Sequence, residues 1–318
     1  MSQIAFVGLG RMGMPMCAAL VRAGYHVVAT DKRAERKAEA AECGASWQPT
    51  SAQAAAAADV LITMLPGPVD VQAAMLGAHG ALKALAAGAT WIDMTSNNPA
   101  AARRVREQAV GQGVEVLEAP VGGGIAAAAE GRLQLFVGGD PGTVERHRAL
   151  LEVLGELGRI VHVGGHGAGY TAKLLVNLLW FGQAVATAEV LLLREREGIG
   201  REVLVQALAC SSAASTFVCR DIEAVFDGDY LPSFGLDRIC EELEAVTALA
   251  RGHGVPWELS EQVRQTYRRA LARYGPADGE LLAVALLEEE AGQTLRRGRS
   301  GRGGCGRDGG GSLRRRPG

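Results

Sequence analysis

A glycine-rich turn follows the first apolar run of the chain and has the sequence Gly8-Leu9-Gly10-Arg11-Met12-Gly13. A segment of helical pattern comes directly after it and runs to about Ala23. In a turn of this kind Gly8 permits the sharp change of direction, Gly10 lets a diphosphate approach the backbone, and Gly13 lets helix pack on strand. The free N–H groups at the helix N-terminus would bind the diphosphate. The pattern therefore predicts a dinucleotide site.

The end of the second predicted strand indicates which dinucleotide is bound. Asp31 lies 18 residues after Gly13, close to the spacing of about 20 expected for a carboxylate that binds a ribose diol. That carboxylate would repel a 2′-phosphate and favours NAD. Lys32 and Arg33 follow it and could attract the phosphate, so NADP stays open. The alternative, a glycine-rich turn that binds no dinucleotide, is disfavoured by this context.

Short β-rich runs alternate with helical segments as far as residue 163. This alternation favours parallel strands with helices on both faces of the sheet. Beyond Gly164 the pattern is helical, and the apolar segment Ala172–Leu193 predicts an almost fully buried helix. We expect an α/β Rossmann-like N-terminal domain with a mostly parallel sheet (residues 1–164) and an all-α C-terminal domain (165–295). The expected strands are Ile4–Gly8, His26–Thr30, Val60–Leu65, Thr90–Met94, Val114–Glu118, Leu133–Val137 and Ile160–Val163, and the expected later helices are Glu202–Cys210, Leu236–Arg251, Leu259–Tyr274 and Gly279–Ala291.

The last 23 residues, Arg296–Gly318, differ in composition from the rest. Eight Arg, nine Gly and one Asp give this tail a net charge of +7, so residues 1–295 carry −9 of the chain's total of −2. A Gly/Arg tract with one Leu cannot bury enough surface to offset its ordering entropy, and we expect it to be disordered. The acidic body argues against a globally basic nucleic-acid binder.

Cysteine usage and the apolar runs indicate the compartment. The six Cys are scattered with no C-x-x-C pair, which supports neither a disulfide framework nor a zinc site, and no metal is expected. The apolar run Ile4–Gly10 is shorter than a signal-peptide core. The uncharged run Leu174–Ala188 is shorter than the roughly 20 residues of a spanning helix. These features predict a cytoplasmic protein without a membrane segment.

Four stretches in order carry a resemblance to a known family. They are the opening turn extended through Met14-Pro15-Met16, then Asp93-Met94-Thr95-Ser96-Asn97-Asn98-Pro99, Ala119-Pro120-Val121-Gly122-Gly123-Gly124, and Gly167-Ala168-Gly169-Tyr170-Thr171-Ala172-Lys173-Leu174-Leu175-Val176-Asn177. Together they resemble the signatures of the β-hydroxyacid dehydrogenases, the family of 3-hydroxyisobutyrate dehydrogenase and tartronate semialdehyde reductase, as far as about Leu295. The resemblance implies a segment beside the nicotinamide, a substrate loop and a catalytic helix. The expected cofactor contacts are Gly8, Gly10, Arg11, Met12, Gly13, Asp31, Leu65, Pro66 and Ser96.

Lys173 and Asn177 are the expected catalytic pair. They lie four residues apart on a predicted helix and so share a face. The lysine is at the end of the helix where the two domains should meet, a common place for a ligand cleft. Partial desolvation beside a cationic nicotinamide would help its ammonium release a proton. Lys173 would then act as general acid and base while Asn177 orients the substrate; the alternative is a snorkelling Lys with a solvated Asn.

The expected substrate loop is Gly122-Gly123-Gly124, whose consecutive N–H groups could bind a carboxylate. A flexible connection is the alternative. The commonest family form has Ser at the first of these positions, so Gly122 removes a hydroxyl donor and leaves the substrate open. A second departure is Glu241-Glu242, where the family usually has Lys-Asp and the Lys commonly reaches the cofactor. Glu241 reverses that charge, and we hypothesise that Arg238, three residues earlier, substitutes for it.

The expected function is that of an NAD(P)-dependent oxidoreductase acting on a small 2- or 3-hydroxy acid or its semialdehyde. The resemblance and the long apolar helix favour a homodimer or homotetramer. An imine reductase of similar architecture is the nearest alternative, but those relatives generally carry Asp or Tyr in place of Lys173. A non-catalytic dinucleotide-binding protein with a nucleic-acid-binding tail is the other, although this tail lacks interleaved aromatic residues.

Overall fold

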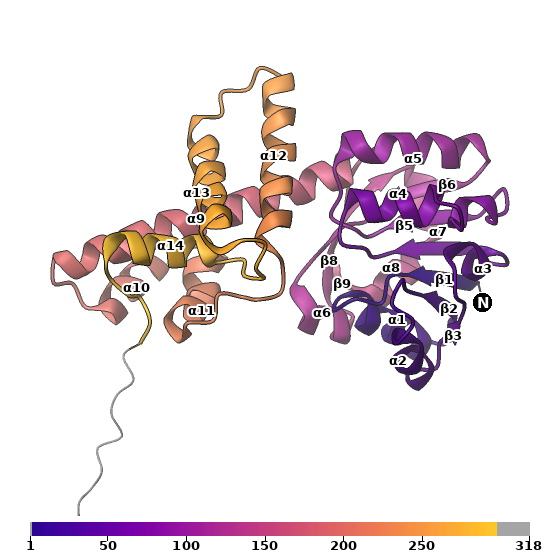
Figure 1. Ribbon diagram of the computed structural model, residues 1–318, viewed down its shortest axis with the longest axis horizontal. Helices are drawn as coiled ribbons and strands as arrows, with labels where there is room; N and C mark the ends of the chain where they lie inside the picture. Colours follow the sequence, from indigo (N-terminus) through magenta and orange to yellow (C-terminus); the bar gives the residue numbers. More distant parts are fainter. Residues whose placement is uncertain (1, 298–318) are drawn as a thin grey trace, which may run out of the picture.

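The computed structural model describes residues 2–297, which form a sheet half and a helical half joined by one long helix (Figure 1). The strands within these residues form one sheet in the order β3-β2-β1-β4-β5-β6-β8-β7, with β9 beside β8. All pairings are parallel except those of β8 with β6 and β7. This confirms the predicted Rossmann-like domain with a mostly parallel sheet. The strands are β1 (Gln3–Val7), β2 (His26–Thr30), β3 (Ser46–Trp47), β4 (Val60–Thr63), β5 (Thr90–Asp93), β6 (Glu115–Glu118), β7 (Val121–Gly122), β8 (Leu133–Gly139) and β9 (Gly155–Gly164).

Helices cover both faces of the sheet, and β1 shows why its strand is apolar throughout. Ile4 and Phe6 belong to the core on one face, whereas Ala5 and Val7 belong to the core on the other, because successive side chains of a strand point to opposite faces. The first core is covered mainly by α1 (Gly13–Arg22), α2 (Arg36–Glu42), α6 (Gly124–Glu130), α7 (Pro141–Arg146) and α8 (Arg148–Leu154), and the second by α3 (Ser51–Ala55), α4 (Pro68–Leu76), η1 (Ala81–Lys83) and α5 (Pro99–Gly111).

The long helix α9 (Ala168–Arg196) leaves the sheet half and supplies core residues to the helical half (Figure 1). Its prediction as an almost fully buried helix is wrong. Other helices pack on one side of it, and several large apolar side chains on another side remain exposed: Leu175, Val176, Leu179, Val190 and Leu193. Among the described helices α9 alone is long and apolar enough to cross a membrane, but it packs against α12, α13 and α14 as a core helix does.

The remaining helices follow the predicted segments closely. They are α10 (Arg201–Ala209), the π-helix η2 (Phe217–Asp221), α11 (Ile222–Asp227), α12 (Leu236–Gly252), α13 (Glu258–Tyr274) and α14 (Leu282–Ala291). The sequence gives no prediction of η2, α11 or the two-residue strands β3 and β7, because such short elements show no hydrophobic period.

The end of the described chain contacts the helical half. The backbone N–H of Arg297 donates to the carbonyl of Phe226 at 2.8 Å, and its guanidinium pairs with Glu223 and, at 2.7 Å, with Asp227. Arg296 and Arg297 were expected to belong to a disordered tail, and for these two residues that prediction is wrong: Arg297 pairs with α11, and Arg296 stacks on Tyr230. The rest of the predicted tail, 298–318, lies outside the described residues.

Candidate active site

The glycine turn leaves room for a ligand at one position and none at the other two. A Cβ at Gly13 would overlap the carbonyl oxygen of Gly8, and a Cβ at Gly8 would overlap that of Met64. At Gly10, by contrast, no atom lies within 4 Å of where a Cβ would stand. Met12, which precedes α1, provides no side-chain hydrogen bond to cap the helix. The turn therefore fits a diphosphate on the first N–H groups of α1.

The carboxyl ends of three neighbouring strands meet at this turn. Gly8 follows β1, and a Cβ there would lie 2.8 Å from a methyl group of Leu65, which follows β4. The N–H of Leu65 donates to the hydroxyl of Thr95 at 3.1 Å, which brings in the loop after β5 that carries Ser96. Ligands of open α/β sheets bind at this edge. The structure thus brings together Gly8, Leu65 and the Ser96 loop from the predicted cofactor set.

Asp31 is already fully hydrogen-bonded in the protein. Its Oδ2 accepts from the N–H of Leu9 at 2.7 Å and from Arg33 Nη2 at 3.2 Å, and its Oδ1 accepts from the N–H and Nε of Arg33 at 2.9 and 3.0 Å. Burial alone would raise the pKa of Asp31, but the hydrogen bonds from Arg33 and Leu9 hold it below its usual value. A ribose diol that bound this carboxylate would therefore have to compete with the guanidinium of Arg33.

Two arginines, Arg11 and Arg238, lie near the loops at the carboxyl edge of the sheet. Arg11 Nη1 donates to the carbonyl of Pro232 at 2.5 Å and lies 3.8 Å from Asp278, so its side chain bridges to the helical half. Arg238, on α12, lies near the loop after β4: its Nη1 would be 3.4 Å from a Cβ at Gly67, next to Pro66. The same nitrogen bonds Glu241 at 2.9 Å. Arg238 therefore lies beside the loop after β4, and its contact with a cofactor stays a hypothesis.

The predicted catalytic pair lies near the start of α9 together with an acid from α12. Asn177 Nδ2 donates to Glu242 Oε2 at 2.7 Å. Burial lowers the pKa of Lys173 below its usual value, and the charges of Glu242 and Glu280 act against that shift. Burial likewise raises the pKa of Glu242, against the effects of Lys173, Asn177 and the hydroxyl of Ser96. Lys173, Asn177, Ser96 and Glu242 therefore form one group, drawn from both halves of the protein.

Glu242 was not among the predicted site residues, although the sequence carries a signal for it. Glu242 is 8% exposed and stands one residue before Leu243 and three after Ile239, which are fully buried members of the apolar face of α12. An acid at helical spacing within an apolar face is a buried acid, and such groups are concentrated at functional sites. Its Oε1 has no hydrogen-bond partner among the described residues.

Two consecutive residues of the expected substrate loop have left-handed backbone. Gly123 and Gly124 have φ angles of +113° and +73°, and α6 begins at Gly124. Gly122 does not need to be glycine, since a Cβ there would make ordinary contacts with Gln134 and Phe136 at 3.5 to 3.8 Å. Among the described residues no hydrogen bond joins this loop to Lys173 or Asn177, so its role in substrate binding stays a prediction.

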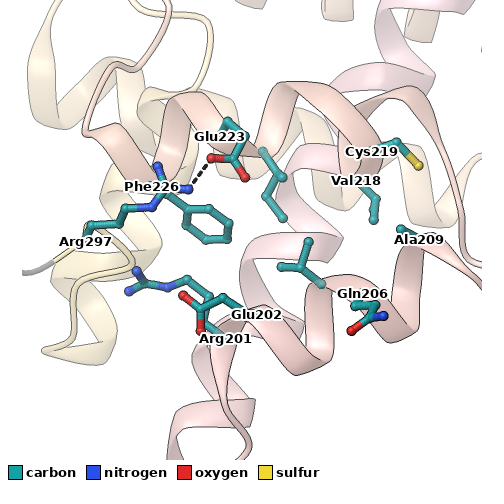
Figure 2. Close-up of a pocket in the computed structure, with 11 residues that line it drawn as sticks. Arg201, Glu202, Gln206, Ala209, Val218, Cys219, Glu223, Phe226 and Arg297 are labelled. Atoms are coloured by element: carbon teal, nitrogen blue, oxygen red, sulfur yellow. Dashed lines mark hydrogen bonds and ion pairs between the residues drawn. The ribbon is translucent and has the colours of Figure 1, made fainter.

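A cavity of about 290 Å³ lies elsewhere, between α10 and α11 of the helical half (Figure 2). Arg201 and Arg297 both stack on Phe226, at 4.9 and 5.6 Å from its ring centre. Arg297 is in addition paired with Glu223. None of the predicted site residues lines this cavity. Its lining residues are Arg201, Glu202, Val205, Gln206, Ala209, Val218, Cys219, Ile222, Glu223, Phe226 and Arg297.

Comparison with known proteins identifies the family. Residues 3–165 match the NAD-binding domain of 6-phosphogluconate dehydrogenase, and residues 167–287 match the NAD-binding domain of NADP-dependent 3-hydroxyisobutyrate dehydrogenase. The chain is 37% identical over 215 residues to 3-hydroxyisobutyrate dehydrogenase of Pseudomonas aeruginosa, covering 68% of this chain and 72% of that protein. It is 30% identical over 289 residues to 2-(hydroxymethyl)glutarate dehydrogenase of Eubacterium barkeri, covering 91% and 95%.

A solved structure agrees with these relatives. The 3-hydroxyisobutyrate dehydrogenase of Mycobacterium tuberculosis, determined with L-serine, superposes with a TM-score of 0.81 at 30% identity, covering 90% of this chain and 99% of that one. The expected resemblance and the expected class of enzyme are both confirmed. The chain belongs to the 3-hydroxyisobutyrate dehydrogenase family and is an NAD(P)-dependent hydroxyacid dehydrogenase.

Proposed function

We propose that the enzyme interconverts a small 2- or 3-hydroxy acid and its carbonyl form, with Lys173 as general acid and base. The observation that carries this proposal is the group at the start of α9, where Lys173 lies with Asn177 and Glu242 beside the loop of Ser96. NAD(P), when bound, supplies the hydride acceptor or donor. The cytoplasm is the compartment we propose.

The chain's own residues would handle the proton. Burial favours the neutral amine of Lys173, which can accept the hydroxyl proton of the substrate during oxidation. In the reverse direction the ammonium returns that proton to the developing alkoxide. Asn177 is held by Glu242 Oε2, which leaves its amide oxygen and second N–H free to orient the substrate. The N–H groups of Gly122–Gly124 would bind the substrate carboxylate.

The test is a substrate panel read by nicotinamide absorbance, with NAD and NADP supplied separately. The panel holds 3-hydroxyisobutyrate, serine, glycerate, threonate and a sulfonated analogue in oxidation, and a semialdehyde and a cyclic imine in reduction. We expect turnover of at least one hydroxy acid and of the semialdehyde. Reduction of the imine without turnover of any hydroxy acid would favour the imine-reductase alternative and overturn this proposal.

Arg33 is expected to control the choice of cofactor. Arg33→Ala frees both oxygens of Asp31 for a ribose diol and removes a cation that could bind a 2′-phosphate. A hydrogen bond to a charged group contributes about 1.5–3 kcal/mol, so the ratio of kcat/KM for NAD to that for NADP should rise by about tenfold or more. Arg36→Ala, which removes an arginine bonded to Glu39, is the matched control. An unchanged ratio in Arg33→Ala contradicts the prediction.

Restoring a hydroxyl at residue 122 is expected to strengthen substrate binding. The space at Gly122 accepts a side chain without strain, and one neutral hydrogen bond contributes about 0.5–1.5 kcal/mol. Gly122→Ser should therefore lower KM for the preferred hydroxy acid by about two- to tenfold. Gly122→Ala adds the Cβ without the hydroxyl and should leave KM near that of the wild type. Equal KM values for the Ser and Ala variants would remove this residue from the carboxylate site.

The exposed apolar face of α9 supports a homodimer or homotetramer. Leu179 and Leu193 are 65% and 62% exposed, and clustered apolar surface of this kind marks protein interfaces. Light scattering of the wild type should give a mass at least twice that of one chain. Leu179→Asp should reduce that mass, whereas Val69→Asp, which changes an exposed valine of α4, should not.

A further inference from the structure

Two buried carboxylates tie the start of α9 to the sheet. Asp93 ends β5 and Glu118 ends β6, and the two side chains are almost completely excluded from solvent. Glu118 Oε1 accepts from the N–H of Gly167, the residue before α9, at 2.6 Å. Asp93 Oδ2 accepts from the hydroxyl of Tyr170, in the first turn of α9, at 2.8 Å. The helix that carries Lys173 is thus anchored by side chains of the dinucleotide-binding half.

Asp93 also holds the loop that follows its own strand. Its Oδ1 accepts from the hydroxyl of Thr63 at 2.8 Å and from the N–H of Thr95 at 3.1 Å. Asn97 Nδ2 donates at 3.0 Å to Oδ2, the same oxygen that accepts from Tyr170. Residues 95–97 therefore have a fixed position relative to α9, because one carboxylate binds both.

The parts that Asp93 connects are the two sides of the active site. Ser96 lies between its two anchored neighbours and contacts Glu242, while Lys173 follows Tyr170 by three residues, less than one helical turn. Tyr170 is 1% exposed, and burial beside Asp93 and Glu118 raises its pKa well above the usual value. Its hydroxyl consequently stays a donor across the working range of pH.

We propose that Tyr170 and Asp93 are positioning residues that set the place of Lys173 relative to the Thr95–Asn97 loop. This inference rests on the proposed function, in which Lys173 carries the proton. A displacement of about 1 Å at a reacting group can reduce turnover by about 100-fold. The hydrogen bond to Asp93 fixes the base where the substrate hydroxyl meets the cofactor, and the aromatic ring alone, packed by van der Waals contacts, would not set that position.

The test compares Tyr170→Phe with Tyr230→Phe. Both remove a buried or half-buried hydroxyl that donates to a carboxylate, since the hydroxyl of Tyr230 bonds Glu288 at 2.5 Å in the helical half. Each variant is expected to lower Tm by a few degrees. Tyr170→Phe alone should lower kcat about tenfold and raise the primary isotope effect on kcat with substrate deuterated at the carbinol carbon. Its Kd for NAD should stay within twofold.

The isotope effect and kcat are the readouts that a purely structural role would not move. If Tyr170→Phe lowers Tm as Tyr230→Phe does and leaves kcat and the isotope effect unchanged, the inference is overturned. If Tyr170→Phe does not fold, Asn97→Ala replaces it in the test. Asn97 Nδ2 donates to the same oxygen of Asp93 as the hydroxyl of Tyr170. Asn97→Ala should also lower kcat and raise the isotope effect, and wild-type values in it would likewise overturn the inference.

Failure of the proposed function gives a different result. In that case the wild type turns over no hydroxy acid, or Lys173→Ala retains its rate. A wild type that is active and depends on Lys173, combined with a Tyr170→Phe variant of normal kcat, removes only the positioning role.

Discussion

Lys173→Ala is expected to lower kcat by about 10²- to 10⁴-fold, the usual contribution of a positioned acid–base group. The neutral amine that burial favours, which is the proton acceptor in the proposed mechanism, is lost. Lys173→Arg should be nearly as slow, because a guanidinium does not release its proton in this range of pH. The measurement is steady-state turnover of the best hydroxy acid from the panel.

Two controls separate this effect from damage to the fold. Lys37→Ala removes an exposed lysine of α2 and should leave kcat unchanged. The Kd of NADH for Lys173→Ala, measured by the fluorescence of the reduced nicotinamide, should stay within about twofold, because the diphosphate is expected to bind at the glycine turn. A Lys173→Ala enzyme with near-normal kcat would remove the residue from the mechanism.

Glu242→Gln is expected to shift the pH dependence of oxidation. In the proposed mechanism oxidation requires neutral Lys173, so kcat/KM should rise with pH through the pKa of this amine. Burial holds that pKa below 10.5, and the carboxylate of Glu242 acts to raise it. Removal of the opposite charge of Glu242 should therefore move this rising limb of the pH profile to lower pH by about one unit or more. At the pH optimum kcat/KM should fall by about tenfold, because Asn177 loses its charged acceptor.

The stability of the same variant gives an independent check. Burial raises the pKa of Glu242 above 4.5, so the folded state binds this proton more tightly than the unfolded chain. The contribution of the group to stability is then greatest at acid pH and is lost as the pH rises through the folded pKa. Glu242→Gln should not lower Tm at neutral pH. Glu242→Asp keeps the charge and should retain the wild-type pH limb; a limb equally displaced in both variants would contradict the electrostatic explanation.

The sequence predicts the sheet half well because each signal there is local. The glycines of the turn are required by contacts within the turn itself, as the overlap between Gly13 and Gly8 shows, and apolar runs buried on both faces mark parallel strands. The reversed direction of β8 could not be predicted in this way. Its pairing with β6 and β7 depends on how the chain returns to the sheet, which leaves no trace in the composition of the strand.

The sequence motifs could be identified directly, but the contacts that their side chains make in the site could not be predicted as well. Asp31 was expected to face a ribose, but the fold of Arg33 back onto it depends on a rotamer that spacing does not determine. The grouping of Lys173 with Asn177 follows from helical spacing, whereas Glu242 comes from a helix 65 residues further along the chain than Asn177. Only the tertiary fold brings that acid to the lysine. The exposure of one side of α9 likewise depends on the tertiary fold, because the helices that pack against α9 cover only part of its surface.

One uninterrupted helix has an evolutionary consequence. Helix α9 has 29 residues and spans roughly 43 Å, with Lys173 in its second turn and much of the interior of the helical half beyond it. Ala184 and Ala188 of α9 lie deep in that interior. A change of side-chain volume at either residue should shift α9, and Lys173 would shift with it. Laboratory selection for heat tolerance in the distal half should therefore repeatedly yield mutants with altered turnover, although none of them touches the substrate.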